Sequence, residues 1–198
     1  MDKYAPQLTR RTTTVNTYEN IINALKKERL LENYPDKILD YGAGYGRGHN
    51  LLQRAWENST VISYDPYDVE ADHVIQNISN EQNNTFDVVF CIHVLNVCMP
   101  ATRGKITTHI DNLLKNNGIA VYVARAYYGD IENTKTGVRG DEVKSMLIPQ
   151  GNNNYTYQRG FDFFELGTEV AWKTNAKIHM LEYGKNRPPA VYYKKGER

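Results

Sequence analysis

Short apolar runs alternate with segments of helical spacing along the first 126 residues. The apolar runs predict strands at 37–41, 60–64, 73–75, 86–92 and 119–124, with two more near the end at 177–183 and 190–193. Apolar residues at helical spacing predict helices at about 17–34, 49–58, 101–116 and 161–172. The run 86–92 is apolar on both faces, which is typical of a buried parallel strand.

This alternation predicts an α/β fold, a parallel sheet with helices on both faces. The 198 residues are predicted to form a single domain. Its parts are an N-terminal arm and helix (1–35), a core (37–126) and a closing helix with a strand pair (161–198). Residues 127–160 hold many Gly, Asn and Tyr residues with little periodicity, so we expect an irregular loop there that covers a substrate.

Composition and charge bear on the partners and the compartment expected for the chain, and they say little about its chemistry. The formal net charge of +1 gives no global attraction for nucleic acid or membrane, and no apolar run approaches the length of a membrane span. The polar N-terminus lacks the apolar middle of a signal peptide. Cys91 and Cys98 are interpreted as reduced thiols without zinc-ligand spacing, so a cytoplasmic location is expected.

The strand at 37–41 leads into a glycine turn, in which Gly42, Gly44 and Gly46 stand at alternate positions before a helix. Glycines let a ligand lie against bare backbone, and the amides of the helix start favour polar or anionic groups, so a mononucleotide-like ligand is indicated. Asp65 ends the second strand, where a carboxylate can accept hydrogen bonds from both hydroxyls of a ribose. An NAD-binding turn requires a third glycine where Arg47 stands, which disfavours NAD.

The pattern Asp40-x-Gly42-x-Gly44-x-Gly46 resembles motif I of the class I S-adenosylmethionine-dependent methyltransferases, and the resemblance covers roughly residues 37–126. It implies a doubly wound, mostly parallel Rossmann-like sheet with an antiparallel strand at one edge, and S-adenosylmethionine as cofactor. In this family the glycine turn underlies the amino acid part of the cofactor, Asp65 binds the ribose, and the residues after the fourth strand lie near the transferred methyl group.

The resemblance therefore implies a set of cofactor-binding residues: Asp40, which would receive the ammonium group, then Tyr41, Gly42, Ala43, Gly44, Asp65, Pro66, Tyr67, Asn77, Ile78, Ile92 and His93. His93 is also the one candidate catalytic residue, as a proton acceptor, although an isolated histidine is more often structural. Methyl transfer needs little acid–base help, because the cofactor already carries a sulfonium leaving group.

Two motifs of nucleic-acid methyltransferases are missing. Residues 91–96 do not fit the D-P-P-Y motif of DNA amino-methyltransferases, and no proline precedes either cysteine as in cytosine-C5 enzymes. A closer resemblance is to putative methyltransferases associated with DNA phosphorothioation, although Ala43 stands where that family has cysteine and this chain is much shorter. The motifs that carry it are 40–44, 65–66, Val94-Leu95-Asn96-Val97, Arg11-Thr12-Thr13-Thr14 and Thr156-Tyr157-Gln158-Arg159. This resemblance implies that the N-terminal arm and the late motif belong to the same site as the glycine turn.

Residues 155–161 have two interpretations. Interleaved aromatic and basic residues suit stacking on a planar substrate, whereas the same alternation is typical of a strand with one buried and one exposed face. We predict a methyltransferase whose acceptor is unidentified, with a nucleic acid or a small molecule as candidates and no membrane partner. The alternative is an S-adenosylmethionine-binding sensor or partner subunit without transferase activity, which would keep the same cofactor residues.

Overall fold

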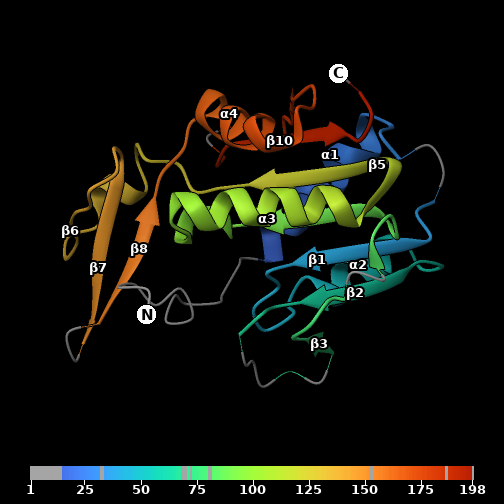
Figure 1. The fold of residues 1–198 in the computed structure, drawn as a ribbon, viewed down its shortest axis with the longest axis horizontal. Helices are drawn as coiled ribbons and strands as arrows, with labels where there is room; N and C mark the ends of the chain where they lie inside the picture. The colour runs from blue at the N-terminus through green and yellow to red at the C-terminus, as the bar shows by residue number, and fades with distance from the viewer. Residues whose placement is uncertain are drawn as a thin grey trace.

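The computed structural model describes residues 15–31, 34–67, 71, 73–79, 82–151, 154–185 and 187–197. Its centre is a seven-stranded sheet (the large sheet) of order β3-β2-β1-β4-β5-β10-β9 (Figure 1). Its strands are β1 (Lys37–Tyr41), β2 (Thr60–Tyr64), β3 (Val74–Ile75), β4 (Phe86–Ile92), β5 (Leu114–Val123), β9 (His179–Met180) and β10 (Ala190–Lys194). β1 to β5 are parallel, and β10 runs antiparallel to both β5 and β9. The predicted fold class is confirmed, with the antiparallel strand one place in from the edge.

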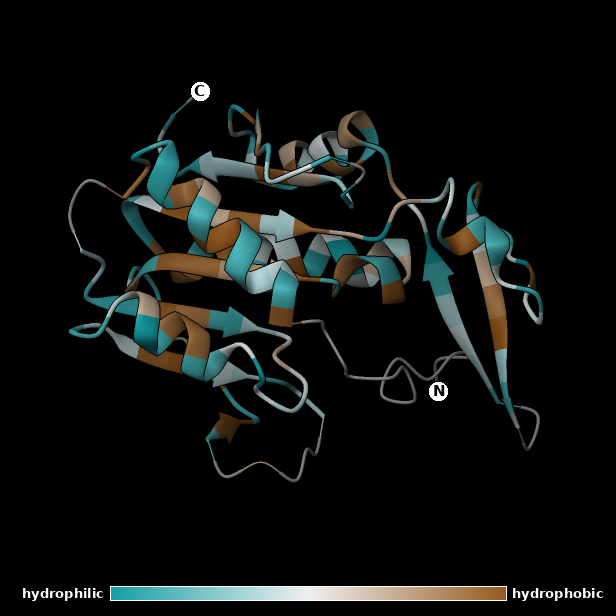
Figure 2. Ribbon diagram, turned by 180° about the vertical axis from the view of Figure 1, so that it is seen from behind, coloured by the Kyte–Doolittle hydropathy of each residue, from teal (hydrophilic) through white to brown (hydrophobic). Residues whose placement is uncertain are grey.

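Helices cover both faces of the large sheet because alternate strand residues point to opposite sides. Ile38 and Phe90 pack in one hydrophobic cluster with α1 (Val15–Lys27) and α2 (His49–Ala55). Leu39 and Cys91 pack in the other with α3 (Pro100–Leu113) and α4 (Phe163–Thr174). Hydrophobic residues accordingly concentrate along the central strands (Figure 2). No helix in the described part of the chain is long and apolar enough to cross a membrane.

The helix predicted over 101–116 ends three residues earlier, at Leu113, and β5 begins directly at Leu114. Asn117 and Gly118 therefore do not stop a helix. They lie inside β5, where Asn117 has a φ of 66° and the pairing with β4 changes register between Phe86 and Val88. Asn117 and Gly118 therefore accompany a β-bulge-like irregularity within β5 instead of ending a helix.

The expectation of an irregular loop over 127–160 is wrong. These residues contain a three-stranded antiparallel sheet (the small sheet) of β6 (Val138–Arg139), β7 (Ser145–Gly151) and β8 (Asn154–Arg159). The interpretation of 155–161 as a strand is confirmed by β8, although Thr156, Tyr157 and Gln158 are buried in succession rather than on one face. The small sheet stands on the side to which the carboxyl ends of β1 and β5 point (Figure 1).

A buried ion cluster fastens the small sheet to α3 and α4. The Arg103 guanidinium, on α3, donates to both carboxylate oxygens of Glu142 at 3.1 and 2.6 Å and lies 3.1 Å from Glu169 on α4. Arg159 of β8 lies 2.7 Å from the same Glu142 carboxylate, and the Tyr157 hydroxyl also donates to it. The small sheet is thus held by charged contacts that bridge three parts of the chain.

Candidate functional site

A cavity of about 760 Å³ lies between the carboxyl ends of the parallel strands and the small sheet. The chain order of the sheet reverses between β1 and β4, and ligands of open α/β sheets bind outside the strand ends at such a point. Nine of the predicted site residues line this cavity: Tyr41, Gly42, Ala43, Gly44, Asp65, Pro66, Tyr67, Ile92 and His93. The residues that follow β1, β2 and β4 therefore meet at one place, as the parallel topology requires.

The glycine turn is fixed against the end of β2. The amides of Gly42 and Ala43 donate to the Tyr64 carbonyl at 2.7 and 2.9 Å. Gly42 has a φ of 74°, and a Cβ placed there would lie 2.4 Å from the Val94 Cγ2 atom. Both the backbone conformation and the close approach thus require glycine, and the turn presents backbone to the cavity.

Asp65 holds its carboxylate at the edge of the turn. Its Oδ2 accepts from the Gly44 amide at 2.9 Å, and its Oδ1 accepts from the Tyr67 amide at 3.0 Å. The residue is 7% exposed and lines the cavity. A carboxylate oriented by two backbone donors keeps lone pairs for a ligand's hydroxyl groups.

Three predicted residues do not line the cavity. Asp40 is fully buried beside Gly48, and its Oδ1 accepts a hydrogen bond of 2.8 Å from the Tyr18 hydroxyl of α1. Burial raises the pKa of Asp40 to about 7, although the Tyr18 hydrogen bond opposes the shift. Asn77 and Ile78 follow β3 and lie outside the cavity lining.

His93 sits on the cavity wall in a left-handed backbone conformation, with a φ of 59°. Its amide donates to the Val123 carbonyl at 2.8 Å, so β5 holds the residue in place. Burial lowers the pKa of the imidazole to about 4, with help from the Arg125 charge and against that of Asp130. The side chain is therefore neutral at pH 7, and its Nδ1 has no hydrogen-bond partner in the described part of the chain.

Sequence reasoning missed much of the opposite wall. Arg125 follows β5, and its Nε donates to Asp130 Oδ2 at 2.9 Å. Its place after the fifth strand was a usable signal, because the ends of parallel strands meet at one edge. The late motif, singled out by its aromatic and basic residues and by the resemblance, contributes Thr156 and Gln158 to the cavity. Asn96 of the motif 94–97 joins them from the 3-10 helix η3 (Leu95–Val97). The motif Arg11–Thr14 lies outside the described residues.

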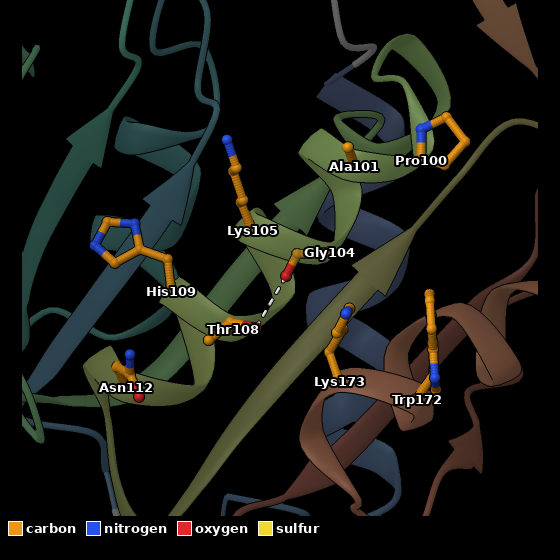
Figure 3. A pocket seen from close by; sticks show the side chains of 9 residues that line it. All are labelled: Pro100, Ala101, Gly104, Lys105, Thr108, His109, Asn112, Trp172 and Lys173. Carbon is orange, nitrogen blue, oxygen red and sulfur yellow. Dashed lines mark hydrogen bonds between the residues drawn. The ribbon is translucent and has the colours of Figure 1, made fainter.

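A second hollow, of about 470 Å³, lies on the outside of α3 and α4 (Figure 3). Lys105 and His109 of α3 face it, and Trp172 and Lys173 of α4 border it. None of the predicted site residues lines this hollow. The predicted site residues therefore gather at the larger cavity and not at this hollow.

The sequence pattern of the family described as "Methyltransferase domain" matches residues 16–137, more than half of the chain. No curated protein matches the chain. A Pyrococcus horikoshii protein has a similar solved structure, with a TM-score of 0.66, 13% identity and 96% of each chain covered. A sugar N-methyltransferase from Streptoalloteichus also has a TM-score of 0.66, at 13% identity, covering 95% of this chain and 90% of its own.

A third similar structure is a Burkholderia thailandensis N1-methyltransferase with bound 1,6-didemethyltoxoflavin and S-adenosylhomocysteine. Its TM-score is 0.56 at 14% identity, with 91% of this chain and 80% of that chain covered. At such identities these likenesses establish a shared fold, whereas the family match extends over the glycine turn, Asp65 and the fourth and fifth strands. The chain therefore belongs to the methyltransferase domain family, and its cofactor is S-adenosylmethionine.

Proposed function

We propose that this methyltransferase binds S-adenosylmethionine across the glycine turn and Asp65 and transfers its methyl group to an acceptor held against the small sheet. The observation that carries the proposal is the carboxylate of Asp65, oriented by the Gly44 and Tyr67 amides at the edge of the cavity. It stands beside a turn whose bare backbone leaves room for a ligand. The position suits the two hydroxyl groups of a ribose.

The residues present fit this cofactor. Gly42, Ala43 and Gly44 offer backbone to its amino acid part, and Pro66 and Tyr67 line the same side of the cavity as Asp65. We assign Asp40 an indirect part, because its buried carboxylate contacts Tyr18 rather than the cavity. Asn77 and Ile78 are left out of the proposed cofactor contacts, since they do not line the cavity.

When bound, S-adenosylmethionine would supply an electrophilic methyl group on a sulfonium, which an acceptor's lone pair could take while sulfur keeps the electron pair of the C–S bond. Ile92 and His93 would lie beside the reacting atoms, since they follow β4 and line the cavity. The neutral imidazole of His93 could accept the proton that the methylated acceptor releases. Alignment of the acceptor and exclusion of water by the cavity walls would supply most of the acceleration.

We infer that residues 127–160 contribute to acceptor binding as a structured wall. Ile148 and Gln150 of β7 and Thr156 and Gln158 of β8 line the cavity. A relation to the phosphorothioation-associated proteins is supported by one contact in particular. The Asn96 Nδ2 atom donates to Gln158 Oε1 at 3.1 Å, so two motifs of that resemblance, 94–97 and 156–159, adjoin the same cavity.

Transfer of a radiolabelled methyl group from S-adenosylmethionine into pools of DNA, RNA, protein and small molecules tests the proposal. Label is expected in one pool, and Asp65→Ala should greatly reduce it. Calorimetry with S-adenosylhomocysteine, S-adenosylmethionine and NAD should detect only the two adenosyl ligands. Tight cofactor binding without label in any pool would instead favour a sensor or partner subunit.

A further inference from the structure

Four polar side chains from separate parts of the chain form a hydrogen-bonded row along the cavity wall. Asp130, just before the 3-10 helix η4 (Ile131–Asn133), accepts from the Arg125 Nε at 2.9 Å and also from its Nη2. The Arg125 Nη1 donates to Gln158 Oε1 of β8 at 3.5 Å. The same oxygen accepts from Asn96 Nδ2 at 3.1 Å, and all four residues line the cavity.

This row fixes the orientation of two amides that could otherwise be flipped. A guanidinium has donors only, so Gln158 must present its oxygen to Arg125. The Asn96 group that meets this oxygen must then be the NH₂ group. Asn96 Oδ1 is consequently left as an acceptor, and it has no hydrogen-bond partner in the described ranges of the chain.

The unpaired oxygen of Asn96 indicates a ligand group. Asn96 is 1% exposed, and a buried amide oxygen without a donor is unfavourable. The residue borders the cavity close to His93, three positions earlier in the chain, whose Nδ1 likewise has no partner among described residues. A ligand that donates a hydrogen bond here would satisfy a group that the row has already positioned.

The charges around the cavity disfavour a charged acceptor at this place. Arg125 and Asp130 neutralise each other. Asp65 belongs to the proposed cofactor end, where two backbone amides hold it, and Arg187 is an exposed lining residue whose charge remains solvated. Among the described residues that line the interior, Val94, Val97, Ile106 and Ile148 supply apolar contacts.

We propose that the methyl acceptor is a neutral molecule that donates an N–H group to Asn96 Oδ1, as a carboxamide or a lactam-type ring does. This inference rests on the proposed function and names its substrate class. The row from Asp130 to Asn96 acts as a specificity element, because an acceptor without the N–H group leaves Asn96 Oδ1 unpaired.

The state of His93 agrees with this class. Burial and Arg125 lower the pKa of its imidazole to about 4, which makes it a weak base. Because the lone pair of an amide-type nitrogen is delocalised, its N–H proton must leave as the new C–N bond forms, and the unpartnered Nδ1 of His93 is placed on the cavity wall to accept it.

Binding of probe pairs to the protein saturated with S-adenosylhomocysteine tests the inference by NMR titration. The pairs are thymidine with 3-methylthymidine and nicotinamide with N,N-dimethylnicotinamide, so each pair differs in the N–H donor. Benzoate and benzylamine serve as charged probes, and a short single-stranded oligothymidylate separates a nucleic acid from a free small molecule. At least one N–H probe should bind about tenfold or more tightly than its methylated twin.

Asn96→Ala should abolish the preference for the N–H probe and leave the affinity for S-adenosylhomocysteine unchanged. Gln158→Leu should weaken the same preference. Asn112→Ala, which removes an amide from the outer hollow of Figure 3, should preserve the preference. The inference is overturned if no N–H probe binds at millimolar concentration, if a charged probe binds best, or if the preference survives in both cavity variants. Failure of the wild-type protein to bind S-adenosylhomocysteine would instead overturn the proposed function beneath it.

Discussion

Replacement of Arg103 by methionine should loosen the small sheet without touching the cofactor. Its side chain is 2% exposed and contacts two carboxylates: Glu142, with a shortest distance of 2.6 Å, and Glu169, at 3.1 Å. It also donates to the Cys98 carbonyl at 2.9 Å. Methionine fills a similar volume but leaves both carboxylates and the carbonyl without this donor.

The loss of stability in Arg103→Met depends on which partners each carboxylate keeps. Removing one partner of a buried ion pair destabilises a protein by about 3–5 kcal/mol. Glu142 keeps Arg159 at 2.7 Å and the Tyr157 hydroxyl, so we expect the lower end, about 3 kcal/mol. In a chain of this length this corresponds to a fall in Tm of about 6–12 °C.

Thermal unfolding and amide hydrogen exchange measure the two consequences. The amides of β8 (Asn154–Arg159) should lose protection earlier than those of β4, because the cluster holds the small sheet and not the centre of the large one. Lys105→Met, an exposed change two residues along the same helix, should alter stability by less than about 0.5 kcal/mol. Equal stability of the two variants would refute the structural role of the ion cluster.

Gly42→Ala and Asp40→Asn test the region around the glycine turn, and Gly129→Ala serves as a control outside it. Gly42→Ala and Gly129→Ala both place a side chain at a φ near 75° (74° and 76°), which should cost about 1–2 kcal/mol in denaturant unfolding, and Gly42→Ala should cost more because its Cβ also meets Val94. Only Gly42→Ala also brings a Cβ to 2.4 Å from Val94, so only this variant should bind S-adenosylhomocysteine more weakly. Equal affinities of the two variants would contradict a close approach of the ligand to Gly42. Burial raises the pKa of Asp40 from 3.8 to about 7 against the Tyr18 hydrogen bond, so the folded state binds that proton more tightly and stability falls as pH rises between these values. The stability lost by the wild type amounts to at most about 1.4 kcal/mol per pH unit, and Asp40→Asn should remove this loss. If the stability difference between Asp40→Asn and the wild type does not change with pH, Asp40 is not its cause.

The sequence was most informative where hydrophobicity and topology act together. The strands 37–41, 60–64 and 86–92 were predicted to the residue, because polar or glycine residues end each apolar run. The same parallel order predicted that Gly42, Asp65 and His93 meet, and all three line the cavity. Local pattern and chain order are sufficient for this half of the site.

The other half depends on contacts between distant residues. Thr156 and Gln158 are polar yet buried, because they line the cavity rather than a hydrophobic core, so the sequence does not show which face of β8 is buried. Asp40 illustrates the opposite case: its place in the motif suggested a direct ligand contact, whereas Tyr18, 22 residues earlier, covers it. Asn96, the partner of Gln158, and Tyr18, the partner of Asp40, both lie too far along the chain for a local sequence pattern to show them.

The central claim is that Asp65 and the glycine turn hold the adenosyl cofactor, and calorimetric titration with S-adenosylhomocysteine tests it most directly. Wild-type protein should bind the ligand, and Asp65→Ala should bind it about 1–3 kcal/mol more weakly, because the ribose hydroxyls lose a charged acceptor. Asp141→Ala, which removes an exposed carboxylate outside the cavity, should bind like wild type. Unchanged affinity in Asp65→Ala, or no binding to wild-type protein at millimolar concentration, would contradict the account.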